Sequence, residues 1–184
     1  MPVKLQGAVA LRKALAVVEP TLAKEVSKEI GSFLKPVVTQ ARGFLPTNEQ
    51  APSGWLKRPN AGGRWASRSY DAQEARKGIT FKSTPSKPNR NGFQALASIF
   101  NKSAAGAIYE TAGRKNPNGQ EWVGAKAGGA SKGVSRSVNP HAGEQFINNL
   151  PPLVNSLKGR GRLILRAWAQ DQGKAYGAAI KAID

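Results

Sequence analysis

The chain has 184 residues, 40% of them hydrophobic, and a formal net charge of +17 at pH 7. This length fits one domain with extensions, and the absence of cysteine excludes disulfide-stabilised secreted scaffolds and thiolate metal sites. No apolar run approaches the roughly 20 residues of a membrane-spanning helix and no signal-peptide core is present, so we expect a soluble protein without membrane contact.

The N-terminal quarter of the chain has helical periodicity. Apolar residues at 5–18 recur at three- and four-residue steps, and Pro20 suits the first turn of a second helix. The same spacing continues over 22–41, with lysines and glutamates on the opposite face. Because Pro36 lies inside this second pattern, we expect a kink or a short break near residues 32–33.

Residues 47–90 change character, with glycine and proline punctuation and no sustained period. They predict a long loop that contains one or two short strands. Residues 78–83 alternate as a strand, and a polar turn joins them to 93–100, which predicts an antiparallel pair. The spacing of the apolar residues in 93–100 also fits a helix face, so that alternative stays open.

The C-terminal part begins with 116–140, a stretch with only Trp122–Val123 as a possible short strand. A loop of this length is usually functional or becomes ordered with a partner. Residues 144–150 predict a short helix, and Pro151–Pro152 would restart it. Gly159 to Gly161 would then separate it from a terminal helix that begins near Arg162 and is apolar around much of its circumference.

These elements predict an α+β fold in one domain spanning residues 1–184. A long kinked N-terminal helix and a C-terminal helix would pack on a small antiparallel sheet, with long basic loops outside it. Along the chain we expect N-terminal helices (1–45), a basic loop and strand (46–92), a core strand and turn (93–115), a flexible loop (116–140) and C-terminal helices (141–184).

Positive charge is concentrated in the middle of the chain, where residues 46–140 carry +10 of the +17. Solvated basic loops and a specific anion-binding role explain this equally well. Tryptophans interleaved with arginine and lysine could stack on bases and contact phosphates, but we favour their anchoring a loop to the core or to a neighbouring subunit. The candidate docking or anion-contact residues are Trp55, Lys57, Arg58, Arg64, Trp65, Arg68, Lys126, Lys132 and Arg136.

Catalytic motifs are weak throughout. Residues 129–133 match GxSxG, with His141 downstream, but a nucleophile elbow needs a buried strand before the serine and a helix after it, and both flanks are loop-like. A single histidine without cysteine cannot form a usual zinc site, and Gly124–Gly129 lacks the lysine and serine of a phosphate loop. The acidic residues are too dispersed for a paired-carboxylate site. We therefore expect no enzyme, no cofactor and no metal.

The order of these regions resembles a family. A charged amphipathic N-terminal region, a Gly/Pro-rich span, a short strand region, the phrase SAAGAIYETAGRKN at 103–116 and a compact C-terminal helix are similar to the tail-completion or neck (head–tail joining) proteins of long-tailed bacteriophages. Members place an aromatic residue before a small-residue and glycine turn, and the matching positions here are Tyr109, Glu110 and Gly113.

This resemblance implies a structural virion protein, made in the host bacterial cytoplasm and located in the neck. It would be a homo-oligomer, usually a hexameric ring, that completes the tail and joins it to the head connector. Its neighbours would be head-closure, tail-terminator or tail-tube proteins, with transient contact to packaged DNA. The alternative is a basic nucleic-acid-binding protein, although no helix-turn-helix, zinc-finger or ribonucleoprotein motif is present.

Overall fold

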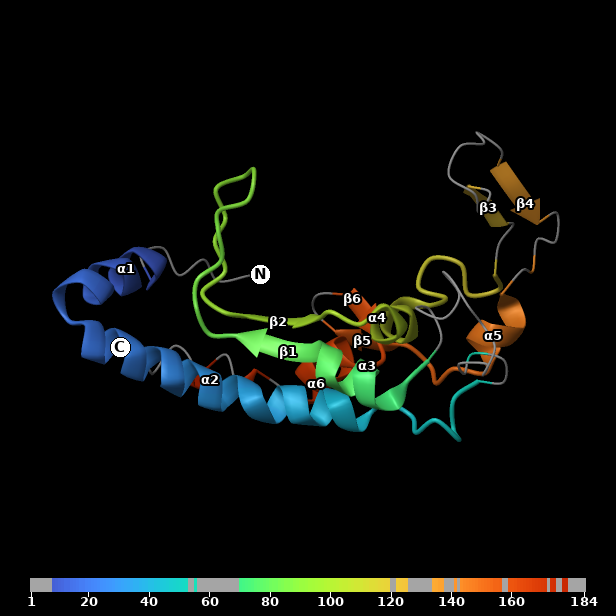
Figure 1. The fold of residues 1–184 in the computed structure, drawn as a ribbon, viewed down its shortest axis with the longest axis horizontal. Helices are drawn as coiled ribbons and strands as arrows, with labels where there is room; N and C mark the ends of the chain where they lie inside the picture. The colour runs from blue at the N-terminus through green and yellow to red at the C-terminus, as the bar shows by residue number, and fades with distance from the viewer. Residues whose placement is uncertain are drawn as a thin grey trace.

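The computed structural model describes residues 8–52, 55, 70–119, 122–125, 134–137, 141, 143–156, 159–171, 173–174 and 177–178. Within these residues it contains six helices and three two-stranded antiparallel sheets (Figure 1). The predicted α+β class is confirmed. Within the same residues, no helix combines the length and apolar character that crossing a membrane requires.

Two N-terminal helices form a hairpin at one end of the molecule (Figure 1). Helix α1 (Ala8–Val18) turns at Glu19 into α2 (Pro20–Gly43), and Pro20 occupies the first turn of α2, where a missing N–H leaves no bond unmade. Of the kink or short break expected near 32–33, the break is wrong, because α2 continues through Pro36 to Gly43. Pro36 is exposed, so the carbonyl that loses its helical donor can be hydrated.

The first sheet packs along α2. Strand β1 (Ile79–Lys82) pairs antiparallel with β2 (Ser98–Asn101), which confirms the predicted antiparallel pair, and Phe81 lies opposite Ile99. The second strand is shorter than the predicted 93–100 and is shifted towards its C-terminal end. On the helix side, Gly31 lets the Phe81 ring approach, because a Cβ there would lie 3.3 Å from Phe81 Cε2.

Helix α3 (Ala72–Gly78) precedes this sheet and corrects the prediction of loop and strand over 47–90. Asp71 caps it, because its carboxylate accepts the Glu74 N–H at 2.9 Å. An aspartate followed three residues later by a glutamate is a helix-start signal, and the helix is only 7 residues long. The helix is therefore too short to show a hydrophobic periodicity in the sequence.

The C-terminal half alternates short helices with short strand pairs. Helix α4 (Ala104–Thr111) precedes β3 (Trp122–Ala125), which pairs with β4 (Val134–Ser137). Helix α5 (Glu144–Asn148) is followed by β5 (Val154–Ser156), paired with β6 (Gly159–Gly161), and by α6 (Ile164–Asp171).

Two predictions for this half are wrong. Pro151–Pro152 does not restart a helix, because β5 follows it, and Gly159–Gly161 is a strand rather than a helix separator. Helix α6 begins at Ile164 and ends at Asp171, and Gly173 follows with a φ of 80°. Residues 174 and 177–178 are helical again, so the predicted terminal helix is interrupted.

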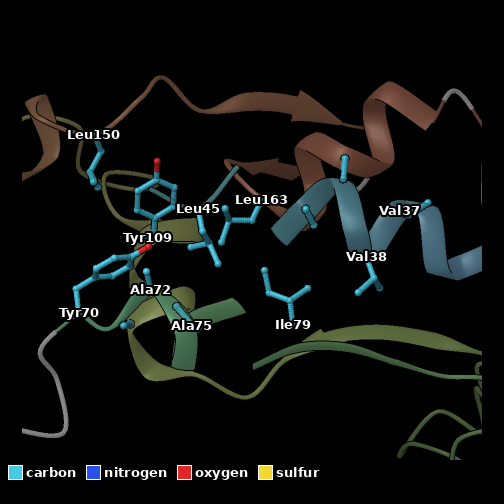
Figure 2. Packing of buried hydrophobic residues seen from close by; sticks show 13 residues of the cluster. Val37, Val38, Leu45, Tyr70, Ala72, Ala75, Ile79, Tyr109, Leu150 and Leu163 are labelled. Atoms are coloured by element: carbon cyan, nitrogen blue, oxygen red, sulfur yellow. The ribbon is translucent and has the colours of Figure 1, made fainter. Parts of the chain in front are cut away.

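The core lies where α2, α3, α4, β1 and α6 meet. Val37, Val38 and Ala41 of α2 contribute one side of it, and Ile79 and Leu163, both fully buried, lie against them (Figure 2). A second, smaller cluster is built on Val26, Ile30 and Leu34, earlier in α2, and includes Leu96 and Trp168 at its edge. A single long helix thus supports both halves of the fold.

Candidate functional site: a helix joint, an aromatic cluster and a basic arm

A buried carboxylate caps helix α6 from another helix. Residue 163 is in the N-cap position of α6, and a leucine there cannot accept a hydrogen bond from the exposed N–H groups of the first turn. Glu110 of α4 accepts them instead. Its Oε2 accepts the N–H groups of Arg162, at 3.0 Å, and Leu163, and its Oε1 accepts that of Leu165 at 3.0 Å. A negative charge is favourable at this end of the helix.

Arg162, next to this cap, makes the reciprocal contact, because it binds the C-terminal end of α4. The Arg162 guanidinium donates to the carbonyls of Tyr109, at 3.1 Å, and Ala112, at 2.7 Å, at the C-terminal end of α4, and to that of Pro151. A positive charge stabilises this end of a helix. Burial lowers the pKa of Arg162 from its usual value. Each helix therefore supplies the charge that the other needs, and we call this arrangement the helix joint (Glu110 and Arg162).

Two glycines make room for the helix joint. A side chain at Gly161 would collide with the Glu110 carboxylate, so the carboxylate passes directly over this backbone. Gly113 has a φ of 75°, which L residues rarely adopt, and a Cβ there would lie 2.6 Å from Ile147 Cγ2. The Tyr109, Glu110 and Gly113 positions singled out from the sequence thus form the end of α4 and its turn.

Trp55 is held among three aromatic rings. Its ring centroid lies 4.9 Å from that of Tyr70 and 6.4 Å from that of Tyr109, and the Phe146 ring meets it edge-on at 5.0 Å. Such packing contributes about 1 kcal/mol per pair beyond the area buried. For Trp55, this arrangement is typical of a loop anchor.

A hollow of about 300 Å³ lies beside the aromatic cluster. Residues 43–46 after α2, Tyr109 and residues 149–151 line most of it. The described lining residues include no carboxylate, histidine, serine or lysine. Nothing in this lining can act as a nucleophile or a general base near neutral pH.

Tyr70 makes the free energy of unfolding depend on pH in the alkaline range. Its hydroxyl donates to the Pro46 carbonyl at 2.6 Å, and burial raises its pKa to about 12. Above pH 10 the unfolded chain releases this proton while the folded chain retains it, so stability falls as pH rises towards 12. We expect a loss of about 2 kcal/mol by pH 11.5 that Tyr70→Phe lacks. Urea unfolding followed by circular dichroism from pH 8 to 11.5 measures this, and parallel curves for the two proteins would contradict it.

Four arginines serve the fold rather than a partner. Arg12 donates to the Ser83 carbonyl at 2.7 Å, Arg42 to that of Ile79 at 2.7 Å and Arg76 to that of Leu45 at 3.1 Å. Arg162 acts in the same way in the helix joint. Because these four guanidinium groups bind backbone carbonyls, fewer positive charges are available to a partner than the net charge indicates.

A second group of basic residues projects outwards. Residues 82–97, which we call the basic arm, join β1 to β2 and rise away from α2 (Figure 1). Lys82, Lys87 and Arg90 are exposed on it, and none of their side chains makes a hydrogen bond or ion pair with another described residue. Their charges are therefore available to a partner.

Apolar side chains are uncovered at the turn between α1 and α2. Val17 is 84% exposed and Val18 80%, while Leu11 is 46% and Leu22 43% exposed. Leu11 and Val18 are seven residues apart and so share a face of α1. Single exposed apolar residues are normal in a soluble protein, but two adjacent valines left almost fully exposed at a turn favour a contact surface.

Most residues singled out from the sequence cannot be placed. Lys57, Arg58, Arg64, Trp65 and Arg68 lie outside the described residues, as do Lys126, Lys132 and the serine of the GxSxG match, Ser131. The backbone of Arg136 lies in β4, opposite Val123. The sequence signal for the basic arm is that residues 75–109 contain six basic and no acidic side chains.

The part of the chain that the structure describes holds no cluster of three or more histidine, cysteine or acidic side chains that could bind a metal. His141 instead lies 2.9 Å from the Glu144 carboxylate, one helical turn away on the surface. In comparisons with known proteins, no protein-family model, no curated protein and no solved structure matches this chain.

Proposed function

We propose that the chain is a structural protein of the neck of a long-tailed bacteriophage, where copies form a ring that completes the tail and joins it to the head connector. The proposal combines the resemblance carried by residues 103–116 with surfaces that the folded chain leaves uncovered. The observation that carries it is the group of exposed apolar side chains at the α1–α2 turn, with Val17 84% and Val18 80% exposed.

That apolar group favours assembly over a solitary function. Burying apolar surface is worth about 25 cal/mol per Å², so a neighbouring copy that covered these side chains would gain stability. A ring repeats one such contact between a patch and a different patch on the next copy. The group lies at the far end of α2 from the aromatic cluster, so a neighbouring copy that covered it would not contact the opposite end of the molecule (Figure 1).

The helix joint supports a role that needs a rigid scaffold. It fixes the end of α4 to the start of α6 through buried charge-assisted hydrogen bonds, which are stronger than neutral ones. A component of a junction under load benefits from such bonds, and none of the groups in the helix joint is placed to perform chemistry on a substrate.

The test is the position of the chain in particles made from its own genome. We expect a small symmetric set of copies at the head–tail junction by cryo-electron microscopy. Particles that carry Val17→Glu and Val18→Glu together should lack the protein and accumulate unjoined heads and tails, because the charges prevent the apolar contact.

A matched variant controls for the added charge. Ser32→Glu with Thr39→Glu adds the same two charges at exposed positions of α2 away from the turn and should leave joining intact. Complete particles without the chain, or equal failure of both variants, would contradict the proposed role.

The second candidate is a nucleic-acid-binding protein, and the basic arm is the observation that favours it. The two functions separate cleanly, because a free binder would be absent from mature particles yet bind nucleic acid with a steep dependence on salt.

A further inference from the structure

The basic arm is shaped in advance for a partner outside the chain. At its tip, the Asn89 side chain accepts the N–H groups of Asn91 and Phe93, both at 2.9 Å, and the Asn89 N–H donates to the Phe93 carbonyl at 3.0 Å. These bonds close the tip into a fixed turn. Arg90 and Asn91 are in the turn itself, and both are exposed.

The base of the arm is also held in place. The Arg12 guanidinium, from α1, donates to the Ser83 carbonyl at 2.7 Å on one side of the arm and to the Leu96 carbonyl at 3.5 Å on the other side. Halfway along, the Ser86 N–H donates to the Ala95 carbonyl at 2.8 Å. The direction of the arm is therefore fixed before a partner binds. Binding does not cost the conformational entropy of ordering the arm.

The positive charges of the basic arm indicate that its partner is a polyanion. Lys82, Lys87 and Arg90 have no acidic residue near them in sequence, because none occurs between Glu74 and Glu110. From Lys82 to Arg90 an extended strand would reach about 25 Å, so the charges are spread along the arm. A long negatively charged partner can meet all three.

Two features argue against a protein strand as the partner. Pro85 and Pro88 remove N–H donors from the arm, which protects its edge from pairing with another strand. A specific protein interface also has an apolar centre, and Phe93, 57% exposed, is the one large apolar side chain that the described arm leaves exposed.

We infer that the basic arm, an antiparallel loop whose two sides are joined by backbone hydrogen bonds, binds duplex DNA, with Lys82, Lys87 and Arg90 on the phosphates and its tip directed into the major groove. That groove is about 12 Å wide and admits a two-stranded ribbon. Asn91, exposed at the tip, is of the residue type that pairs with adenine edges there. The inference does not depend on the neck role, because a ring can form whether or not the arm contacts DNA.

The experiment must separate the arm from general charge, since a protein of net charge +17 binds DNA weakly through any basic surface. The test variant is Lys82→Gln, Lys87→Gln and Arg90→Gln in the full chain. The matched control is Lys24→Gln, Lys28→Gln and Lys35→Gln, three exposed lysines of α2. Both variants reduce the charge from +17 to +14.

Binding of a labelled duplex of about 20 base pairs is measured by fluorescence anisotropy between about 50 and 300 mM salt. Because each lost phosphate contact lowers the slope of log K against log salt by about 0.9, we expect the arm variant to lose about 2 to 3 units of slope and about tenfold or more in affinity at about 0.1 M salt. The control should lose less than about 1 unit. Lys82→Arg, Lys87→Arg and Arg90→Lys together should bind as the unmodified chain does.

Equal losses in the arm variant and in the control would overturn the inference, since charge alone would then explain binding. A loss confined to single-stranded DNA of the same sequence would also overturn it, because a ribbon seated in a groove requires a duplex. Circular dichroism of each variant confirms that the fold is retained. If the arm does not bind DNA, the particle test of the neck role is unaffected.

Discussion

Replacing Glu110 with alanine is expected to lower the free energy of unfolding by about 4 kcal/mol. The change leaves the N–H groups of Arg162, Leu163 and Leu165 without an acceptor in a buried place, and it leaves the Arg162 charge uncompensated. Glu110→Gln keeps one acceptor oxygen, so its cost should be smaller, at about 2 kcal/mol. Urea unfolding followed by circular dichroism measures both changes.

Glu29→Ala is the control for Glu110, because it removes an exposed helical glutamate and should change stability by no more than about 0.5 kcal/mol. If Glu110→Ala destabilised no more than this control, the helix joint would not hold the two helices. The double variant Glu110→Ala with Arg162→Ala should cost less than the sum of the single changes, since the two side chains stabilise the same contact.

Gly113→Ala is expected to destabilise the chain by about 3 kcal/mol. Part of the loss, about 1 kcal/mol, comes from the φ of 75°, which disfavours any residue with a Cβ. The rest comes from the new methyl group, which would lie 2.6 Å from Ile147 Cγ2 and push α5 away from the turn. Thermal or urea unfolding reports the total.

Gly92→Ala isolates the backbone part of that effect. Gly92 has a φ of 73°, and no neighbouring atom lies within 4 Å of the point that an alanine Cβ would occupy, so its replacement should cost only about 1 kcal/mol. In an Ile147→Ala background the cost of Gly113→Ala should fall to the same value. A cost unchanged by Ile147→Ala would show that the contact with α5 contributes nothing.

The N-terminal helices and the β1–β2 pair could be read from the sequence because their signals are local. Apolar residues at helical spacing over 22–41 predicted α2, and alternation over 78–83 predicted β1. Local signals failed where elements are very short. Strands β5 and β6 have 3 residues each, and two of the residues in β6 are glycines, so no periodicity could reveal their pairing.

The candidate surfaces were predictable only in part. The resemblance drew attention to Tyr109, Glu110 and Gly113, but nothing in the sequence identified Arg162, 52 residues from Glu110, as the other half of the helix joint. The sequence predicts a polar turn at the basic arm, although the charge of the arm is as one-sided as that of the candidate docking residues. Trp55 is among the candidate docking residues of the sequence, and its three aromatic neighbours come from separate segments.

By itself, the sequence determined the amphipathic face of α2, the absence of thiol chemistry and the excess of positive charge. These properties depend on residue identity and on spacing within one or two helical turns. Only the tertiary structure decided how that charge is divided, with Arg12, Arg42, Arg76 and Arg162 donating to backbone carbonyls and the arm residues facing outwards. A guanidinium finds its acceptor wherever folding leaves a carbonyl unpaired, and this is settled by contacts between segments far apart in the chain.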